Sequence, residues 1–180
     1  VAGSSAAVDA FLVVVDGSAG IEVGTDNCWK YATKANLPKA IFINKLDKEN
    51  SDFDSVLSQI QERYGRSCVP VALPIGSEDS LSGVVELLGD ESAVPDDMKD
   101  AYEEGLMALM EVAAETDEEL TDKFLMEETL SHDELTHGLL NGIQSGEIVP
   151  VLCGSMEKDV GLEALLDFIV DCLPSPVDAG

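Results

Sequence analysis

The first third of the chain alternates strand patterns with helix patterns. Three apolar runs, FLVVVD (11–16), KAIFIN (39–44) and CVPVALP (68–74), are rich in β-branched residues and lack regular polar alternation. Such continuous runs are typical of strands that are covered on both faces. The segments between them, about 25–35 and 53–64, carry helix signals. This strand–helix–strand–helix–strand order predicts a parallel α/β sheet.

The predicted helices have recognisable ends. Thr25 or Asp26 can cap a helix that runs to about Ala35, because short polar side chains accept hydrogen bonds from the first free N–H groups. The polar stretch 50–52 caps the next helix, and Gly65 ends it. The apolar side chains of this second helix recur at helical spacing, so we expect it to pack one face on the sheet.

The chain changes character from about residue 75 to residue 147, where the pattern becomes helical and acidic. The dipeptide at 95–96 opens one predicted helix, and Thr116 caps a short second one. Ser131 with Glu134 fits a capping box, in which each residue satisfies an N–H group of the other, for a third helix. The stretch therefore predicts a helical insert with a charged surface. The helical pattern of the insert also predicts a small apolar cluster of its own that includes Leu106, Leu109, Phe124, Leu139 and Leu140.

The sheet pattern resumes after the insert. IVPVLCGS (148–155) is a further apolar strand, and GLEALLDFIVDCL (161–173) is a strongly amphipathic last helix. We therefore predict an α/β fold with two units. Residues 1–74 and 148–176 build the sheet, and residues 75–147 form the helical acidic insert.

Composition and charge restrict the function. Acidic residues number 36 against 10 basic ones, which gives a formal net charge of −26. Such a chain repels a phosphate backbone, so direct nucleic-acid binding is not expected. No apolar run is long enough for a membrane span, so no membrane association is predicted. The four cysteines are scattered, with no close pair of the metal-binding kind, which predicts reduced thiols in a cytoplasmic protein and no metal site.

Polar residues follow three of the predicted strands where each strand ends. They are Asp16, the turn Asn44–Asp47 and the turn Gly154–Met156. In an open α/β sheet, ligands bind outside the carboxyl ends of the strands. The string Asn-Lys-x-Asp is common by itself, but its place at a strand end and the second polar turn make the signal specific. We therefore predict a binding site at this edge of the sheet.

The chemistry of the two turns fits a guanine base. The carboxylate of Asp47 can accept two parallel hydrogen bonds, from the ring N1–H and the exocyclic amine, a pair that adenine does not present. The stem of Lys45 can lie over the ring while its charge stays in water. Asn44 can donate to N7 and tie neighbouring loops together, and a backbone N–H of Ser155 or Met156 can donate to O6. The alternative is an ordinary strand-end turn with a capping asparagine.

Longer stretches extend this pattern. In order along the chain they are VVVDGSAGIEVGT, ATKANLPKAIFINKLDKENSDF, VPVALPIGSEDSLSGVVELL, AAETDEELTDKFL and PVLCGSMEKDVGLEALLDFIVDCLPSP. Together they resemble the GTP-binding domain of translation elongation factor G or an elongation-factor-G-like protein. The resemblance implies a partial Ras-like P-loop GTPase sheet. Residues 75–147 then resemble the helical insert of that domain, the G′ subdomain.

The resemblance also implies a function. The parent protein would be a GTPase that uses GTP and GDP with Mg²⁺ to drive ribosomal translocation in the cytoplasm. Its partners would be the ribosome and, through the insert, the ribosomal stalk proteins. Ribosome-recycling and ribosome-protection GTPases of the same superfamily stay open as alternatives. So does a nucleotide-independent acidic module that binds other proteins.

Three features depart from the family's pattern. The chain has neither a G-x-x-x-x-G-K-[ST] phosphate loop nor a D-x-x-G segment. We therefore expect a piece of the domain that contains no catalytic residue and does not hydrolyse GTP alone. The stretch between Leu88 and Pro95 is shorter than the family's insert. Met156 stands where the family usually has alanine, which would tighten the fit around the base while keeping the backbone contact.

Overall fold

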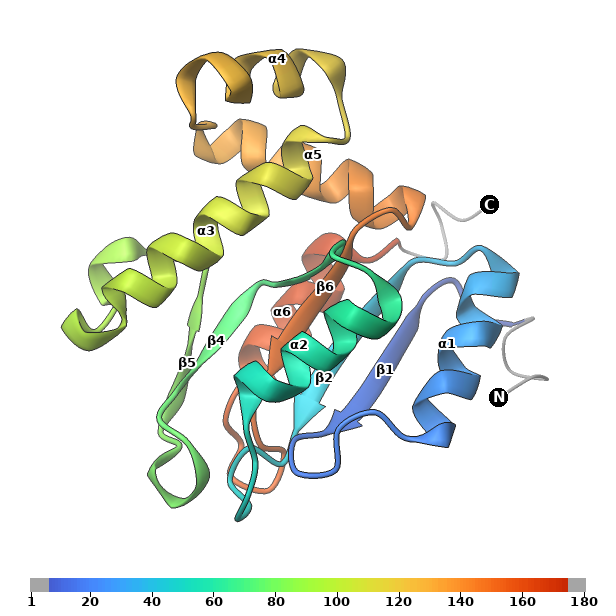
Figure 1. Cartoon of the computed structure of the whole chain (residues 1–180), viewed down its shortest axis with the longest axis vertical. Helices are drawn as coiled ribbons and strands as arrows, with labels where there is room; N and C mark the ends of the chain where they lie inside the picture. Colours follow the sequence, from blue (N-terminus) through green and yellow to red (C-terminus); the bar gives the residue numbers. More distant parts are fainter. Residues whose placement is uncertain (1–6, 175–180) are drawn as a thin grey trace.

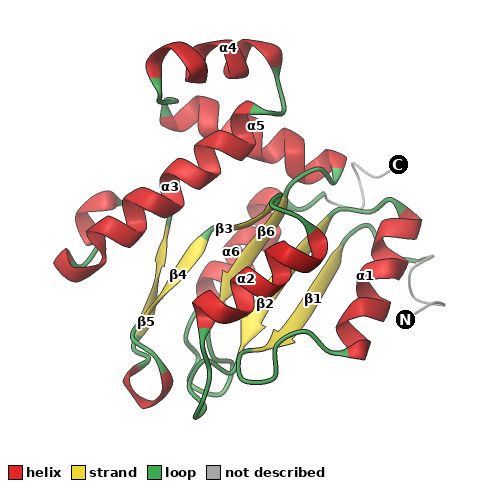
Figure 2. Cartoon of the chain, in the orientation of Figure 1, coloured by secondary structure: helices red, strands yellow, loops and turns green. Residues whose placement is uncertain are grey.

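The structure, a computed structural model, describes residues 7–174 and is built around a four-stranded parallel sheet (Figures 1 and 2). The strand order is β1-β2-β6-β3, and every neighbouring pair is parallel. Figure 1 shows α2 in front of the sheet, α6 behind it and α1 at the right, next to β1. The bounds are β1 (Phe11–Asp16), α1 (Val23–Ala35), β2 (Lys39–Asn44), α2 (Phe53–Tyr64), β3 (Cys68–Pro70), β6 (Val149–Cys153) and α6 (Leu162–Cys172). The predicted α/β fold is confirmed.

The prediction of one strand over residues 68–74 is wrong, because the run divides between two sheets. Its second half is β4 (Ala72–Ile75), which pairs with the antiparallel strand β5 (Gly83–Glu86). Val71 joins the two sheets: its N–H donates to Val151 O at 3.0 Å and its carbonyl accepts from Leu87 N at 2.9 Å. The predicted insert boundary at residue 75 therefore falls inside a strand, and the insert begins with a hairpin.

Two short 3-10 helices, Glu91–Ala93 and Asp96–Met98, follow the hairpin. The insert then has three α-helices, α3 (Lys99–Ala114), α4 (Glu118–Glu127) and α5 (His132–Ser145), which lie above the sheet in Figure 1. The capping box of Ser131 and Glu134 at the start of α5 is confirmed. The cap of α4 is Asp117 rather than Thr116, since the Asp117 carboxylate accepts from Glu119 N at 2.7 Å. A carboxylate is favourable at the N-cap, because its negative charge also complements the positive end of the helix dipole.

The start of α1 also differs from the prediction. The helix begins at Val23, and Glu22 forms a reciprocal capping arrangement with Thr25. Asp26 is free for another role because it does not cap the helix. Its carboxylate accepts from Arg63 Nη2 at 2.7 Å and from Tyr64 Oη at 2.9 Å, so it ties α1 to α2. At the start of α2, Asp52 is the cap, as the polar stretch 50–52 predicted.

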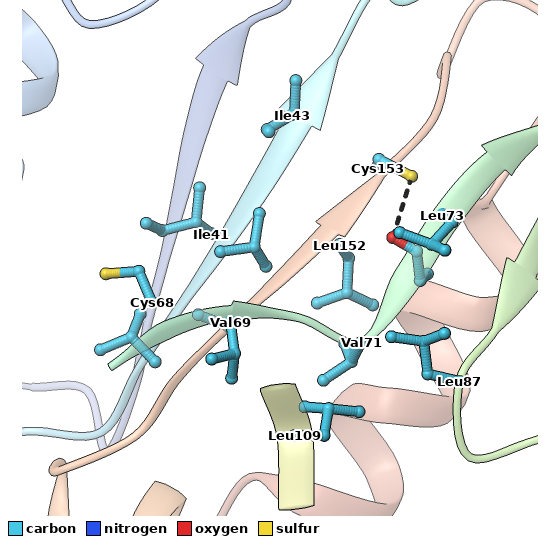
Figure 3. Packing of buried hydrophobic residues seen from close by; sticks show 14 of the residues in the cluster. Ile41, Ile43, Cys68, Val69, Val71, Leu73, Leu87, Leu109, Leu152 and Cys153 are labelled. Atoms are coloured by element: carbon cyan, nitrogen blue, oxygen red, sulfur yellow. Dashed lines mark hydrogen bonds between the residues drawn. The ribbon is translucent and has the colours of Figure 1, made fainter. Parts of the chain in front are cut away.

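The buried apolar residues form one cluster that crosses from the sheet into the insert. Figure 3 shows Leu109 of α3 beside the sheet residues Val69 and Val71. Leu139 of α5 belongs to the same cluster. The helical pattern of the insert predicts a small apolar cluster of its own. The insert instead shares its core with the sheet, since α3 packs directly over the end of β3.

The edge strand β1 departs from the expectation of a strand covered on both faces. Val13 and Val15 are buried, whereas Leu12 and Val14 are 37% and 55% exposed. Within residues 7–174, β1 has a strand on one side only, β2. None of the helices in this part of the chain has the length and apolarity needed to cross a lipid bilayer.

Candidate functional site

The three polar strand endings come together at one edge of the sheet, the lower edge in Figure 1. Asp16 and Asn44 are register partners at the ends of β1 and β2, and Gly17 N donates to Asn44 O at 2.7 Å. The turn after β6 joins them, because Leu46 N donates to Gly154 O at 3.2 Å. The loop after β2, residues 44–52, and the turn after β6, residues 154–161, are called the first and second base loops below.

Asn44 connects the two base loops through its side chain. Its Oδ1 accepts from its neighbour Lys45 N at 2.8 Å and from Met156 N, in the second base loop, at 3.0 Å. The predicted loop-tying role of Asn44 is therefore present in the structure. Because Oδ1 is occupied by two donors, the amide nitrogen Nδ2 is the part of this side chain that can donate to a ligand.

Lys45 is held across the site by an ion pair. Its backbone is left-handed, with φ of 66°, and its Nζ lies 2.7 Å from Asp16 Oδ2. Ser18 N and Ala19 N donate to the other carboxylate oxygen of Asp16, at 2.9 and 3.2 Å, so the anion is fixed in place. Hydrogen bonds from Lys45 and then Ser18 hold the pKa of Asp16 far below its usual range. The contact with Asp16 likewise raises the pKa of Lys45.

Asp47 is a buried carboxylate with one free oxygen. Its Oδ2 lies 3.1 Å from Lys48 Nζ, which also contacts Glu157 Oε2 at 2.7 Å. Oδ1 is buried and has no hydrogen-bond partner of good geometry within the described residues. The nearby Ser155 hydroxyl and then Lys48 lower the pKa of Asp47, so it is ionised at neutral pH. A buried, ionised oxygen of this kind is costly unless a donor reaches it, which a bound ligand can provide.

The second base loop is closed more tightly than predicted. Ser155 is fully buried, and its N–H donates to Val160 O at 2.9 Å. The N–H of Met156 is engaged by Asn44. Both backbone donors that we assigned to a base O6 thus have partners inside the protein, so donation to O6 would require one of these two contacts to open. Gly154 has φ of 157°, and a Cβ there would strike Val160 O, so this turn requires glycine.

The predicted residues therefore gather around one carboxylate. Asp47 offers acceptors for two adjacent donors, Asn44 offers a donor, and the aliphatic stem of Lys45 can cover a planar ring. The orphaned Oδ1 of Asp47 fits a guanine base, whose N1–H and exocyclic amine are adjacent donors. No group of three or more His, Cys, Asp or Glu side chains positioned to hold a metal ion occurs in residues 7–174.

Sequence reasoning missed the partners of these residues. Asp16 was identified as a polar strand ending, and its register position next to Asn44 was the signal that could have revealed its ion pair with Lys45. The pairing of Lys48 with Glu157 joins residues 109 positions apart, and no local pattern indicates it. Cys153 is a buried thiol, and its Sγ donates to Ala72 O at 3.4 Å (Figure 3).

Known proteins of similar sequence or structure place this chain among relatives. The family model described as "Elongation factor Tu GTP binding domain" matches residues 1–175. A crystal structure of a protein from Thermus thermophilus is similar, with a TM-score of 0.86 and 27% sequence identity. The match covers 98% of this chain and 28% of that protein, so the chain spans less than a third of that protein's length.

Proposed function

Because the chain belongs to the elongation factor Tu GTP-binding domain family, we propose that it forms the guanine-reading part of a translational GTPase. The observation that carries the proposal is the ionised, buried Asp47 with its unpartnered Oδ1, next to Asn44 and Lys45. Asp47 accepts from N1–H and the exocyclic amine, Asn44 Nδ2 donates to N7, and Lys45 covers the ring. Ser155 and Met156 complete the pocket and, once Asn44 releases Met156 N–H, reach O6.

The finer proposal is an elongation factor G type of GTPase that acts in ribosomal translocation in the cytoplasm. The ordered stretches quoted above support it, from VVVDGSAG to DCLPSP. Ribosome recycling and ribosome protection are the alternatives within the superfamily. GTP or GDP binds with Mg²⁺ in this proposal. When bound, the ion would supply charge neutralisation at the phosphates.

The proposed partners are the ribosome and, through the insert, its stalk proteins. The acids gathered in residues 78–134 favour a basic partner surface. Association of the full-length protein with purified stalk proteins should slow as salt rises, because exposed charges are screened beyond about 8–10 Å at moderate ionic strength. Salt-independent association would contradict the electrostatic part of this proposal.

Substituting the base-reading carboxylate tests the function directly. In the full-length gene product, Asp47→Asn replaces an acceptor by a donor, so GTP binding should weaken by about 1.5–3 kcal/mol. Xanthosine triphosphate, which presents a carbonyl in place of the exocyclic amine, should bind the variant better than it binds the wild type. Isothermal titration calorimetry of the wild type and of Asp47→Asn with GTP and with xanthosine triphosphate measures this change in nucleotide preference.

Asp122→Asn is the matched control, because it removes the same charge from the exposed surface of α4. It should leave both affinities unchanged. Equal GTP affinity for Asp47→Asn and the wild type would contradict base reading. That result would favour the second candidate, a nucleotide-independent acidic module, which the net charge of −26 suggests.

The 180-residue chain alone is proposed not to hydrolyse GTP. A few hydrogen bonds to the base must offset an association cost of at least ~4 kcal/mol, which leaves about millimolar affinity. Titration of the isolated chain with GTP and Mg²⁺, together with a phosphate-release assay, checks this. Micromolar binding or Mg²⁺-dependent turnover would contradict it.

A further inference from the structure

The turn between β4 and β5, residues 76–82, reaches the first base loop. Glu78 makes two contacts there: its N–H donates to Leu46 O at 2.8 Å, and its Oε1 accepts from Asn50 N at 2.7 Å. Leu46 is buried and directly precedes Asp47. Glu78 therefore contacts the first base loop at Leu46 and at Asn50, on either side of the proposed base-reading carboxylate of Asp47. In Figure 1 this turn lies at the same lower edge as the base loops.

The same turn also holds the second base loop. Lys158 Nζ donates to Glu78 O at 3.4 Å and to Asp79 O at 3.2 Å. The backbone N–H of Lys158 in turn donates to Ser155 Oγ at 3.2 Å. Glu78 thus contacts both segments that carry the proposed base-binding residues, although it lies in a turn outside both of them.

The backbone of this turn is strained in a way that its contacts explain. Glu78 has φ of 52°, a left-handed conformation that glutamate rarely adopts. Gly76 has φ of 80°, and a Cβ there would collide with Ser80 O. Reciprocal hydrogen bonds between Ser77 and Ser80 close the turn. Strained residues persist when surrounding contacts over-determine them, and such residues cluster at functional sites.

We propose that Glu78 is a positioning residue for the base site, which clamps both base loops and so sets the selectivity for the exocyclic amine of guanine and the rate of nucleotide release. The proposal rests on the proposed guanine-reading function. It also makes the β4–β5 hairpin, which opens the insert, the physical connection between the insert and the base.

The test compares Glu78→Ala and Glu78→Gln with Glu128→Ala in the full-length gene product. Glu128 is the matched control: it is also an exposed glutamate with positive φ, at 55°, but it ends α4 in the insert. The readouts are the affinity and dissociation rate of a fluorescent GDP, the affinity ratio of GDP to inosine diphosphate, and the thermal midpoint. Inosine diphosphate lacks the exocyclic amine, so the ratio reports how well Asp47 is placed.

Glu78→Ala should weaken GDP binding about tenfold, the loss expected for one hydrogen bond to a charged group, mainly through faster release. The ratio of GDP to inosine diphosphate affinity should fall, because a less well placed Asp47 carboxylate mainly loses its hydrogen bond from the exocyclic amine. Glu78→Gln keeps an oxygen for Asn50 N–H and should stay within about threefold of the wild type. Glu128→Ala should match the wild type in both nucleotide readouts.

Several outcomes would overturn the proposal. An unchanged affinity ratio in Glu78→Ala, or an equal fall in Glu128→Ala, would show that Glu78 affects folding alone. If Glu78→Ala does not fold, Lys158→Met tests the second contact of the turn, and unchanged GDP release there contradicts the clamp. A wild-type protein without guanine-selective binding would overturn both this inference and the proposed function, whereas selective wild-type binding with an unaffected Glu78→Ala overturns the inference only.

Discussion

Residues with a left-handed backbone occur in two kinds of place, at helix ends and at the base edge, and the causes differ. The base edge is the part of the molecule formed by the two base loops and the turn 76–82. Two non-glycine residues with positive φ, Asn36 and Glu128, end α1 and α4. There the left-handed residue lets free carbonyls find partners within the same helix. The other four in residues 7–174 lie in the loops of the base edge: Lys45, Asn50, Glu78 and Asp159.

Three of these four residues, Lys45, Asn50 and Glu78, contact other loops. Lys45 pairs with Asp16 after β1, and Asn50 and Glu78 bond to each other across 28 positions. The strain at the helix ends is thus local, whereas the strain at Lys45, Asn50 and Glu78 goes with contacts between distant segments, an arrangement that is common at functional sites. Changes at the two kinds of position should have separable effects.

The largest expected effect tests whether the insert and the sheet unfold separately. Leu109→Ala in α3 removes a fully buried side chain from the shared core and should cost about 2–5 kcal/mol. Unfolding should stay one transition, seen equally by helix circular dichroism and by the fluorescence of Trp29, the only tryptophan, which stacks on Tyr64 beside the sheet.

Leu125→Ala on α4 is the control, because this side chain is 75% exposed and its loss should change stability by less than about 0.5 kcal/mol. Two separated transitions in Leu109→Ala, with the helical signal lost first, would mean that the insert unfolds as an independent unit and that the shared core is not cooperative.

A smaller effect is expected at the base edge itself. Asp16→Asn removes the anion that holds Lys45, and since both side chains are partly exposed the loss should be about 1 kcal/mol, or roughly fivefold in nucleotide affinity. In the proposed site Lys45 covers the ring face, so the binding of GTP, inosine triphosphate and xanthosine triphosphate should weaken equally. Thermal stability should change little.

A double-substitution cycle isolates this contact. Lys45→Met keeps an apolar stem and removes the ammonium, so adding Asp16→Asn to it should have no further effect on affinity. Full additivity of the two substitutions, or a loss confined to GTP, would contradict the role of Asp16 in holding Lys45 over the base.

The smallest effect concerns a helix end in the insert. Lys123 and then Ser131 lower the pKa of Glu134 to about 2 from an ordinary value of 4.5. Because the folded-state pKa is the lower one, the stabilisation by Glu134 is complete above about pH 4.5 and is lost as the pH falls towards 2. Glu134→Gln should therefore have a lower melting temperature than the wild type at pH 7, and the gap should close in acid.

Melting curves from pH 7 down to pH 2.5 measure that gap, and nucleotide affinity at pH 7 provides the contrast with the base edge. Affinity should be the same in Glu134→Gln and the wild type. A gap that persists unchanged at pH 2.5 would show that the ion pair with Lys123 is not its source, and weaker nucleotide binding would contradict the distinction between the two kinds of position.

Sequence reasoning succeeded where the cause of a structure is local. The apolar runs of β1, β2 and β6 and the capping box of Ser131 with Glu134 depend on neighbours within a few positions, and they are confirmed. The meeting of Asn44 and Met156 could also be predicted, because parallel strands end at one edge of a sheet.

Sequence reasoning failed where contacts between residues far apart in the chain determine the structure. Val71 divides a continuous apolar run because it bonds to Val151, 80 positions away, and to Leu87. Glu78 sits in a turn that the sequence marks only as polar, and its role depends on the approach of Leu46 and Asn50. The occupied N–H of Met156 likewise depends on which way one asparagine side chain rotates.

The outer edge of β1 has a consequence for the self-association of the isolated chain in solution. Within residues 7–174, Leu12 and Val14 are exposed on a strand whose outer edge pairs with no other strand, and such an edge recruits strands from other molecules. The net charge of −26 opposes such encounters at low salt. Screening shortens the range of this repulsion from about 10 Å at 0.1 M salt to about 3 Å at 1 M. Salt that protects many proteins from precipitation would therefore push this one towards self-association.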